Sequence, residues 1–207
     1  AKIPFTVSGN YGVDSMRFEV KSEELTLTDL VNNLSLDDAE KELSRYKGSG
    51  SVGFDLSIFG STQNQSAPNI ACNFNISNGH LIEPVKHTQI KNLRMKGSFS
   101  SDGNPVNDHL IMDHLAFETP VGPFYGALDI LNFNIPKVSG KAKGTIDLSI
   151  ANRILKNELI HRMDGIAKIN SEFSLVVNEQ VDVKKMNGDI SLYNVWFKAR
   201  NDHRTFE

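Results

Sequence analysis

The chain has 207 residues, with 22 Lys and Arg against 25 Asp and Glu, and its formal net charge is −3 at pH 7. A hydrophobic content of 39% and a charged content of 23% are typical of a folded chain and not of a disordered one. The basic residues are scattered, whereas a nucleic-acid-binding surface gathers them on one face. No apolar run reaches the roughly 18 residues of a transmembrane helix. The length allows one large domain or two small ones, and nucleic acid is not expected as a partner.

Residues 1–35 are predicted to be a lead-in. Met16, Phe18 and Val20 alternate with charged residues, and side chains of one parity share one face of a strand, so this segment is predicted to be a strand. Leu25 and Leu27 suggest a short second one. Residues 36–47 have acids in the first turn and basic residues in the last, followed by Gly48, which predicts a short helix. Residues 36–207 are taken as one β-rich segment.

Period-two alternation covers most of the chain between residues 48 and 117. Strands are predicted over 48–60, 69–81, 90–99 and 110–117. Within the second of these, Asn78-Gly79 is a strong hairpin signal and predicts a turn. The apolar register changes near Asn92 and again between Asp113 and His114, which indicates β-bulges. The polar cluster at 100–107 is predicted to be a turn.

Residues 117–148 hold the clearest hairpin, and the rest of the chain repeats its pattern. Apolar or small residues alternate with polar ones over 124–130 and again over 138–148, on either side of a Pro-containing corner. A second helix is predicted over 151–163, with Asp147 or Ser149 as its cap, and strands resume over 166–177 and 186–197. The predicted fold is all-β, mainly antiparallel, a curled sheet or β-groove with two short helices.

No catalytic or metal-binding pattern emerges, and an enzyme, a metal or a cofactor is not expected. The six histidines are dispersed, and only Asp108-His109 and Asp113-His114 invite a metal interpretation. Five residues apart on a regular strand, the two histidines would point to opposite faces. A hydrolase would need a pocket that brings Asp113, His114 and a hydroxyl together. The single cysteine, Cys72, excludes an internal disulfide and is predicted to be a small core residue.

Loose motifs distributed from about residue 36 to residue 173 resemble the AsmA-like proteins of Gram-negative bacteria, especially those of the Bacteroidetes type. This family is related to TamB and to the bridge-like lipid-transfer proteins. The residues that carry the resemblance are the predicted helix before 46–50, the strand end 56–60, Ile76-Ser-Asn-Gly-His-Leu81, Ile90-Lys-Asn-Leu93, Leu115-Ala-Phe-Glu-Thr-Pro120, Leu131-Asn-Phe133, Pro136-Lys-Val-Ser-Gly-Lys-Ala-Lys-Gly144, Ile146-Asp-Leu148 and Met163-Asp-Gly165.

The resemblance implies a periplasmic segment of a longer protein that is anchored in the inner membrane and concerned with outer-membrane biogenesis. It also implies an apolar β-groove that shields lipid acyl chains, with outer-membrane assembly proteins as further partners. The chain begins without Met and ends directly after a strand-like segment, so we expect it to be a piece excised from such a parent. The candidate groove residues are Val52, Phe54, Leu56, Ile58, Ile70, Phe74, Ile76, Met95, Phe99, Phe124, Leu128 and Ile130.

The alternating pattern also fits a closed β-sandwich, in which a second sheet covers the apolar face. Such a module would be exported and would bind protein or glycan through its polar loops at 61–67 and 100–107. The sequence leaves the open groove and the closed sandwich as alternatives.

Overall fold

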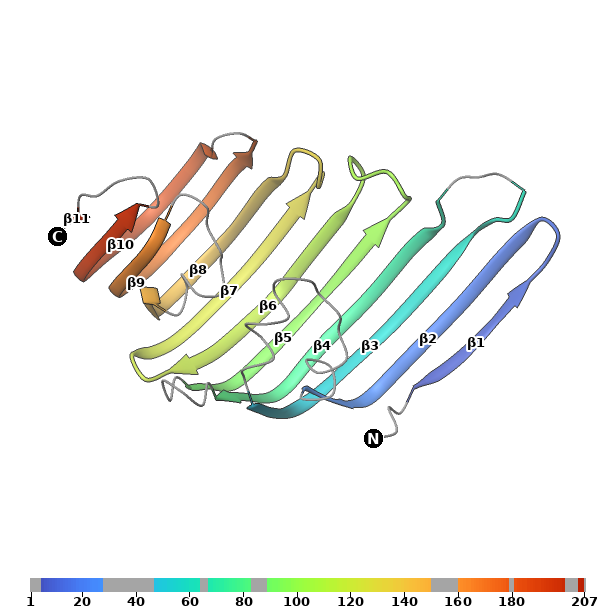
Figure 1. Cartoon of the computed structure of the whole chain (residues 1–207), viewed down its shortest axis with the longest axis horizontal. Helices are drawn as coiled ribbons and strands as arrows, with labels where there is room; N and C mark the ends of the chain where they lie inside the picture. The colour runs from blue at the N-terminus through green and yellow to red at the C-terminus, as the bar shows by residue number, and fades with distance from the viewer. Residues whose placement is uncertain are drawn as a thin grey trace.

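The structure is a computed structural model, and it describes residues 5–27, 47–63, 67–82, 89–149, 160–178, 181–199 and 205–206. These residues form one antiparallel sheet of 11 strands, in which the order across the sheet is the order along the chain (Figure 1). The strands are β1 (Thr6–Tyr11), β2 (Ser15–Thr26), β3 (Lys47–Ser61), β4 (Asn69–Ile82), β5 (Gln89–Ser101), β6 (His109–Thr119), β7 (Gly122–Leu131), β8 (Lys137–Asp147), β9 (Ile160–Val177), β10 (Val181–Ala199) and β11 (Thr205–Phe206).

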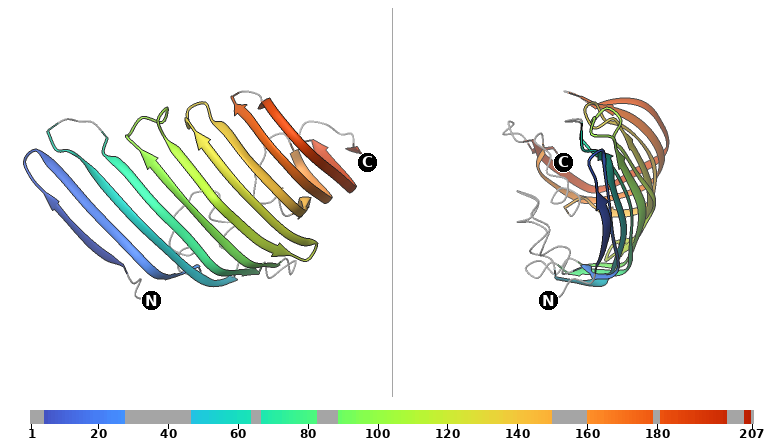
Figure 2. Two further views of the ribbon diagram at one scale, coloured as in Figure 1. Left: turned by 180° about the vertical axis from the view of Figure 1, so that it is seen from behind. Right: turned by 90° about the vertical axis from the view of Figure 1, so that its right-hand side faces the viewer.

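The all-β antiparallel prediction is confirmed, and the sheet is open and curled (Figure 2). The helix predictions fall mainly on 36–46 and 150–159, which lie outside the described residues. Where they reach described residues they are wrong, because Lys47 begins β3 and residues 160–163 begin β9. Met163 pairs with Phe197 of β10, so sheet pairing overrides a spacing that also suits a helix.

The predicted hairpin turn at Asn78-Gly79 is also wrong, because β4 runs straight through it. Asn78 has a φ of 52°, and the pairing with β5 shifts register between Ile76 and Gly79. Asn is one of the few residues that tolerates this left-handed conformation, so here it forms a β-bulge instead of a turn.

Two sequence-predicted bulges are confirmed. Asn92 has a φ of 52°, and the pairing of β5 with β6 shifts between Lys91 and Arg94. The parity slip at Asp113 and His114 coincides with a register shift in the β6–β7 pairing. A further shift after Ser22 carries β2 on through Leu25, so the two short strands expected there are one. Bulges increase the local twist and bend of a sheet, which is consistent with its curl.

One face of the sheet is apolar from one end to the other. Residues directly paired across neighbouring strands share a face, and a row of such pairs can be followed from β1 to β10. Its members are Val7, Val20, Leu56, Cys72, Phe99, Leu110, Ile130, Val138, Leu175 and Val183. The neighbouring row on the opposite face is largely polar and includes Lys21, Asp55, Asn73, Ser98 and Asp129.

The best-buried part of the apolar face is a cluster at the end of the sheet formed by β2 to β5. Leu25, Leu27 and Val52 are each 4% exposed, and Ile76 is 9% exposed. Phe54, Leu81, Leu93 and Met95 pack against this cluster. Elsewhere the described residues include no large side chain that is completely buried, so the sheet lacks the continuous core of a two-layer domain.

Phenylalanine lies opposite glycine at several places on the apolar face. The pairs are Phe18 with Gly9, Phe74 with Gly97, Phe124 with Gly144 and Phe173 with Gly140. A Cβ added at Gly97 would meet Phe74 Cζ at 2.7 Å, and one at Gly140 would meet Phe173 Cζ at 3.1 Å. In both pairs the ring covers the bare backbone of its neighbour, an arrangement that compensates for glycine within a strand.

Gly97→Ala is therefore expected to destabilise the fold, because the new Cβ would lie 2.3 Å from the Ile111 carbonyl oxygen as well as against the Phe74 ring. We expect the free energy of unfolding in urea to fall by about 1–3 kcal/mol, as for other overpacked sites. The matched control is Gly126→Ala, whose new Cβ would lie 3.3 Å from Phe124 Cε1 and 3.4 Å from the Lys141 carbonyl oxygen. In this control the lower entropy of the unfolded chain favours the folded state and offsets the mild crowding. Equal losses in the two variants would contradict this account of the Phe–Gly pairs.

Candidate functional site

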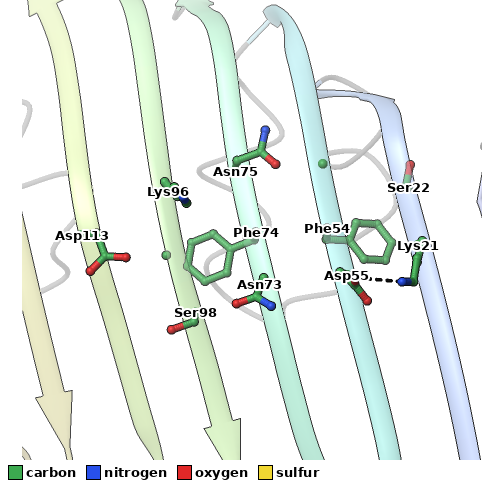
Figure 3. A pocket seen from close by; sticks show the side chains of 12 residues that line it. Lys21, Ser22, Phe54, Asp55, Asn73, Phe74, Asn75, Lys96, Ser98 and Asp113 are labelled. Carbon is green, nitrogen blue, oxygen red and sulfur yellow. Dashed lines mark ion pairs between the residues drawn. The ribbon is translucent and has the colours of Figure 1, made fainter.

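The two faces of the sheet can be assigned to the inside and the outside of its curl. The open side of the curl in Figure 2 (right) is the side turned to the viewer in Figure 1. Figure 3 has the same left-to-right order of strands as Figure 1, but β5 points toward the bottom in Figure 3 and toward the top in Figure 1. Figure 3 therefore shows the sheet from the opposite side, which is the convex side. Lys21, Asp55 and Asn73 line a cavity on that side. The polar face is therefore the outer face, and the apolar face is the inner face.

The structure places every sequence-predicted groove residue on the inner face. Val52, Phe54, Leu56 and Ile58 of β3 pair with Ile76, Phe74, Cys72 and Ile70 of β4. Met95 and Phe99 continue this surface on β5, and Phe124, Leu128 and Ile130 continue it on β7, where Phe124 stacks on Phe117 at a ring-centroid distance of 4.9 Å.

Sequence reasoning left out much of the same surface. The residues it omitted are Met16, Phe18 and Val20 on β2, Leu110, Met112, Leu115 and Phe117 on β6, Ile169, Phe173 and Leu175 on β9, and Val183, Met186, Ile190 and Leu192 on β10. Their alternation is visible in the sequence. On β6 and β10, however, bulges shift the parity partway along the strand, so a single period-two pattern does not connect them.

A row of small residues crosses the inner face from β7 to β10. Gly126 pairs with Ala142, Ala142 with Ser171, and Ser171 with Gly188. On each strand, the next inner-face residue on either side lies two positions away. On one side these neighbours are Leu128, Gly140, Phe173 and Met186, and on the other side they are Phe124, Gly144, Ile169 and Ile190. Four strands span about 14 Å. On β7, β9 and β10, large apolar side chains thus flank this row of small residues.

The inner-face side chains of β10 are far more exposed than those of the cluster formed by β2 to β5. Val52 on β3 is 4% exposed, whereas Ile190 and Leu192 on β10 are 46% and 59% exposed. All described strands belong to the one sheet, so no second sheet made of described residues covers the apolar face. The β-sandwich alternative is therefore wrong for the part of the chain that the structure describes.

The outer face carries shallow cavities. One of about 600 Å³ is bordered by the Lys21–Asp55 ion pair, whose nitrogen–oxygen distance is 3.0 Å, together with Asn75, Lys96 and Asp113 (Figure 3). Asp55 raises the pKa of the Lys21 ammonium through its hydrogen bond and charge. Lys21 is exposed, so we expect this pair to add little stability.

The bulge in β6 corrects the prediction that His109 and His114 point to opposite faces. His109 pairs with Ser100 and His114 with Lys96, which places both on the outer face because one extra residue separates them. His109 Nε2 lies 2.9 Å from Asp129 Oδ1. Among the described residues, no group of three or more His, Cys, Asp and Glu is placed to hold a metal ion.

A second outer cavity, of about 680 Å³, is lined by Asp113, His114 and Tyr125, and also by Ser171, whose side chain lies on the inner face. These include the residue types that the hydrolase hypothesis requires. The Ser171 hydroxyl, however, donates to the Asn187 carbonyl oxygen at 3.0 Å, and Ser171 is only 5% exposed. This hydroxyl is therefore engaged away from His114, and the arrangement lacks the nucleophile–base hydrogen bond of covalent catalysis.

Cys72 lies on the inner face between Leu56 and Phe99. Burial, and secondarily the charge of Asp55, raises the pKa of its thiol. The thiol therefore stays protonated near neutral pH, and a protonated thiol is a poor nucleophile. Cys72 was predicted to be a small core residue; it is half-buried and contributes to the apolar inner face.

The described residues form no helix that is both long enough and apolar enough to cross a membrane. Comparison of the chain with protein-family models, with curated proteins and with solved structures finds no match.

Proposed function

We propose that this chain is a non-enzymatic lipid-handling segment whose inner face shields acyl chains from water. The observation that carries the proposal is the apolar row from Val7 to Val183, which crosses ten neighbouring strands of an open sheet without a polar member. Contiguous exposed apolar surface of this extent is rare unless it meets a partner or a ligand.

An acyl chain is the ligand class that this surface suits best. Burial of apolar surface contributes about 0.8 kcal/mol per methylene group and requires no directional contacts. The inner face offers aliphatic and aromatic side chains with few polar groups, and the small residues Gly126, Ala142, Ser171 and Gly188 form a row across it. A polar headgroup can remain in water at the open side of the curl. The geometry thus fits a ligand with a long apolar chain and a polar end.

The resemblance to AsmA-like proteins supports a cellular setting for this activity. We propose a periplasmic segment of a parent protein anchored in the inner membrane, which serves outer-membrane biogenesis by transporting phospholipid or another lipid. Outer-membrane assembly proteins are the proposed further partners. The open curl of the sheet is compatible with such a role, because a curled surface surrounds an acyl chain on more than one side.

The direct test is binding of a fatty acid that carries a fluorophore at the end of its chain. Purified protein should bind this probe saturably, and unlabelled phospholipid should displace it. Solvent extraction of the freshly purified protein followed by mass spectrometry should recover lipid. The fluorophore without an acyl chain is the control and should not bind. Absence of both extracted lipid and saturable probe binding would contradict the proposal.

A further inference from the structure

The outer edge of β10 is the longest unpaired strand edge among the described residues. β10 spans 19 residues, and β11 pairs with only Phe197 and Lys198. From Val181 to Leu192 no described strand lies beside this edge. The inner-face side chains here are well exposed, with Val181 at 61% and Leu192 at 59%. A long exposed edge with apolar side chains is a template for pairing with another strand.

The sequence of this edge is self-complementary. We propose that two copies of the chain pair through β10, antiparallel, about a twofold axis at Asn187. In this register Lys185 of each copy faces Asp189 of the other, and both positions are exposed. Two opposite-charge pairs therefore form on the outer face, where directly opposed charges of unlike sign are stabilising. Such a pairing is isologous, so the assembly closes as a dimer.

The observed bulge in β10 makes the apolar side chains match as well. Val183 pairs with Leu175 and Lys185 with Ser174 of β9, so Lys184 is the additional residue. If Lys184 is also skipped in the intermolecular pairing, Val183 faces Ile190 and Val181 faces Leu192. All four side chains lie on the inner face, where apolar cross-strand pairs are favourable. A twofold axis perpendicular to the sheet keeps both inner faces on the same side.

Lysines and bulges on an edge strand are also common means of preventing such pairing. In this register they do not prevent it, because each Lys185 meets an aspartate and the two bulges occupy symmetric positions. The other open edge, β1, is a weaker candidate, since it has six residues and no charged side chain. The partner that fits β10 best is therefore a second copy of this strand.

The first test uses a cysteine on the proposed axis. In Asn187→Cys the two introduced thiols would lie opposite each other, with Cα atoms about 4.5–5.5 Å apart, within the range of a disulfide. Mild oxidation should give a covalent dimer. The controls are the native chain, whose single cysteine is Cys72, and Ser191→Cys, which would face Asp182 and not itself. No dimer in Asn187→Cys, or equal cross-linking in Ser191→Cys, would overturn the proposal.

The second test exchanges the charges. Lys185→Asp or Asp189→Lys alone should weaken dimerisation by about tenfold or more in sedimentation equilibrium, because like charges then face each other twice. The double exchange should restore most of the affinity. Melting temperatures should stay near that of the native chain, since both side chains are exposed. A native chain that stays monomeric at high concentration, or a double variant no better than the single ones, would overturn the register.

Discussion

Val52→Asp is expected to remove the cooperative unfolding transition of the chain or to lower its midpoint severely. Val52 is 4% exposed and packs with Leu25, Leu27 and Ile76 in the best-buried cluster of the sheet. The described side chains given as packing against this cluster, Phe54, Leu81, Leu93 and Met95, are all apolar, and burying a carboxylate among such side chains costs several kcal/mol. Typical domains have only about 5–15 kcal/mol of total stability. Thermal and urea unfolding followed by circular dichroism would measure the loss.

The matched control for this variant is Ser51→Asp, the neighbouring position on the exposed outer face. Its charge remains in water, so its midpoint should lie close to that of the native chain. If Val52→Asp unfolds near the native midpoint, the cluster of β2 to β5 does not hold the sheet together as described.

Leu128→Asp is expected to have the opposite pattern, with a large loss of acyl-probe binding and a small loss of stability. Leu128 is only half-buried and lies beside Gly140 and Phe173 on the inner face. Water reaches this site, so the carboxylate stays hydrated in the ligand-free protein. A bound acyl chain would exclude that water and leave the charge unsolvated. We expect the affinity for the fluorescent fatty acid to fall by about tenfold or more, which corresponds to roughly 1.4 kcal/mol.

The control is Ala127→Asp, which changes the adjacent residue on the outer face and should leave probe binding unchanged. Two results would count against the groove at this hairpin. One is a Leu128→Asp protein that melts far below the native chain, which would mean that the site is part of a closed core. The other is a variant that melts and binds as the native chain does.

The alternation of apolar and polar residues was sufficient to predict the strands and their faces in most of the chain. It placed Val52, Phe54, Leu56 and Ile58 on one face of β3, and the structure keeps them together. This succeeds because the period of a strand is a local property of the backbone. The central hairpin of β7 and β8 was predictable for the same reason, with prolines and the Asn134-Ile135-Pro136 corner marking its ends.

What the sequence could not predict depends on contacts between strands. Asn78-Gly79 favours a hairpin turn locally, but pairing on both sides of β4 keeps the strand continuous and makes Asn78 a bulge. The extra residue in β6 brings His109 and His114 to the same face, which parity alone contradicts. Whether a second layer covers an apolar face is likewise not encoded in the alternation, since an open sheet and a sandwich have the same period.

The most direct test of the inner face as the lipid-binding surface is quenching of tryptophan by a brominated fatty acid, which requires contact. The native chain has one tryptophan, Trp196, so the measurement uses a Trp196→Phe background. Phe124→Trp introduces the reporter on the inner face, and Tyr125→Trp introduces it at the next residue, on the outer face. We predict saturable quenching in the Phe124→Trp protein and little quenching in the Tyr125→Trp protein. Equal quenching in both proteins, or quenching of the outer reporter alone, would contradict the assignment of the inner face as the lipid-binding surface.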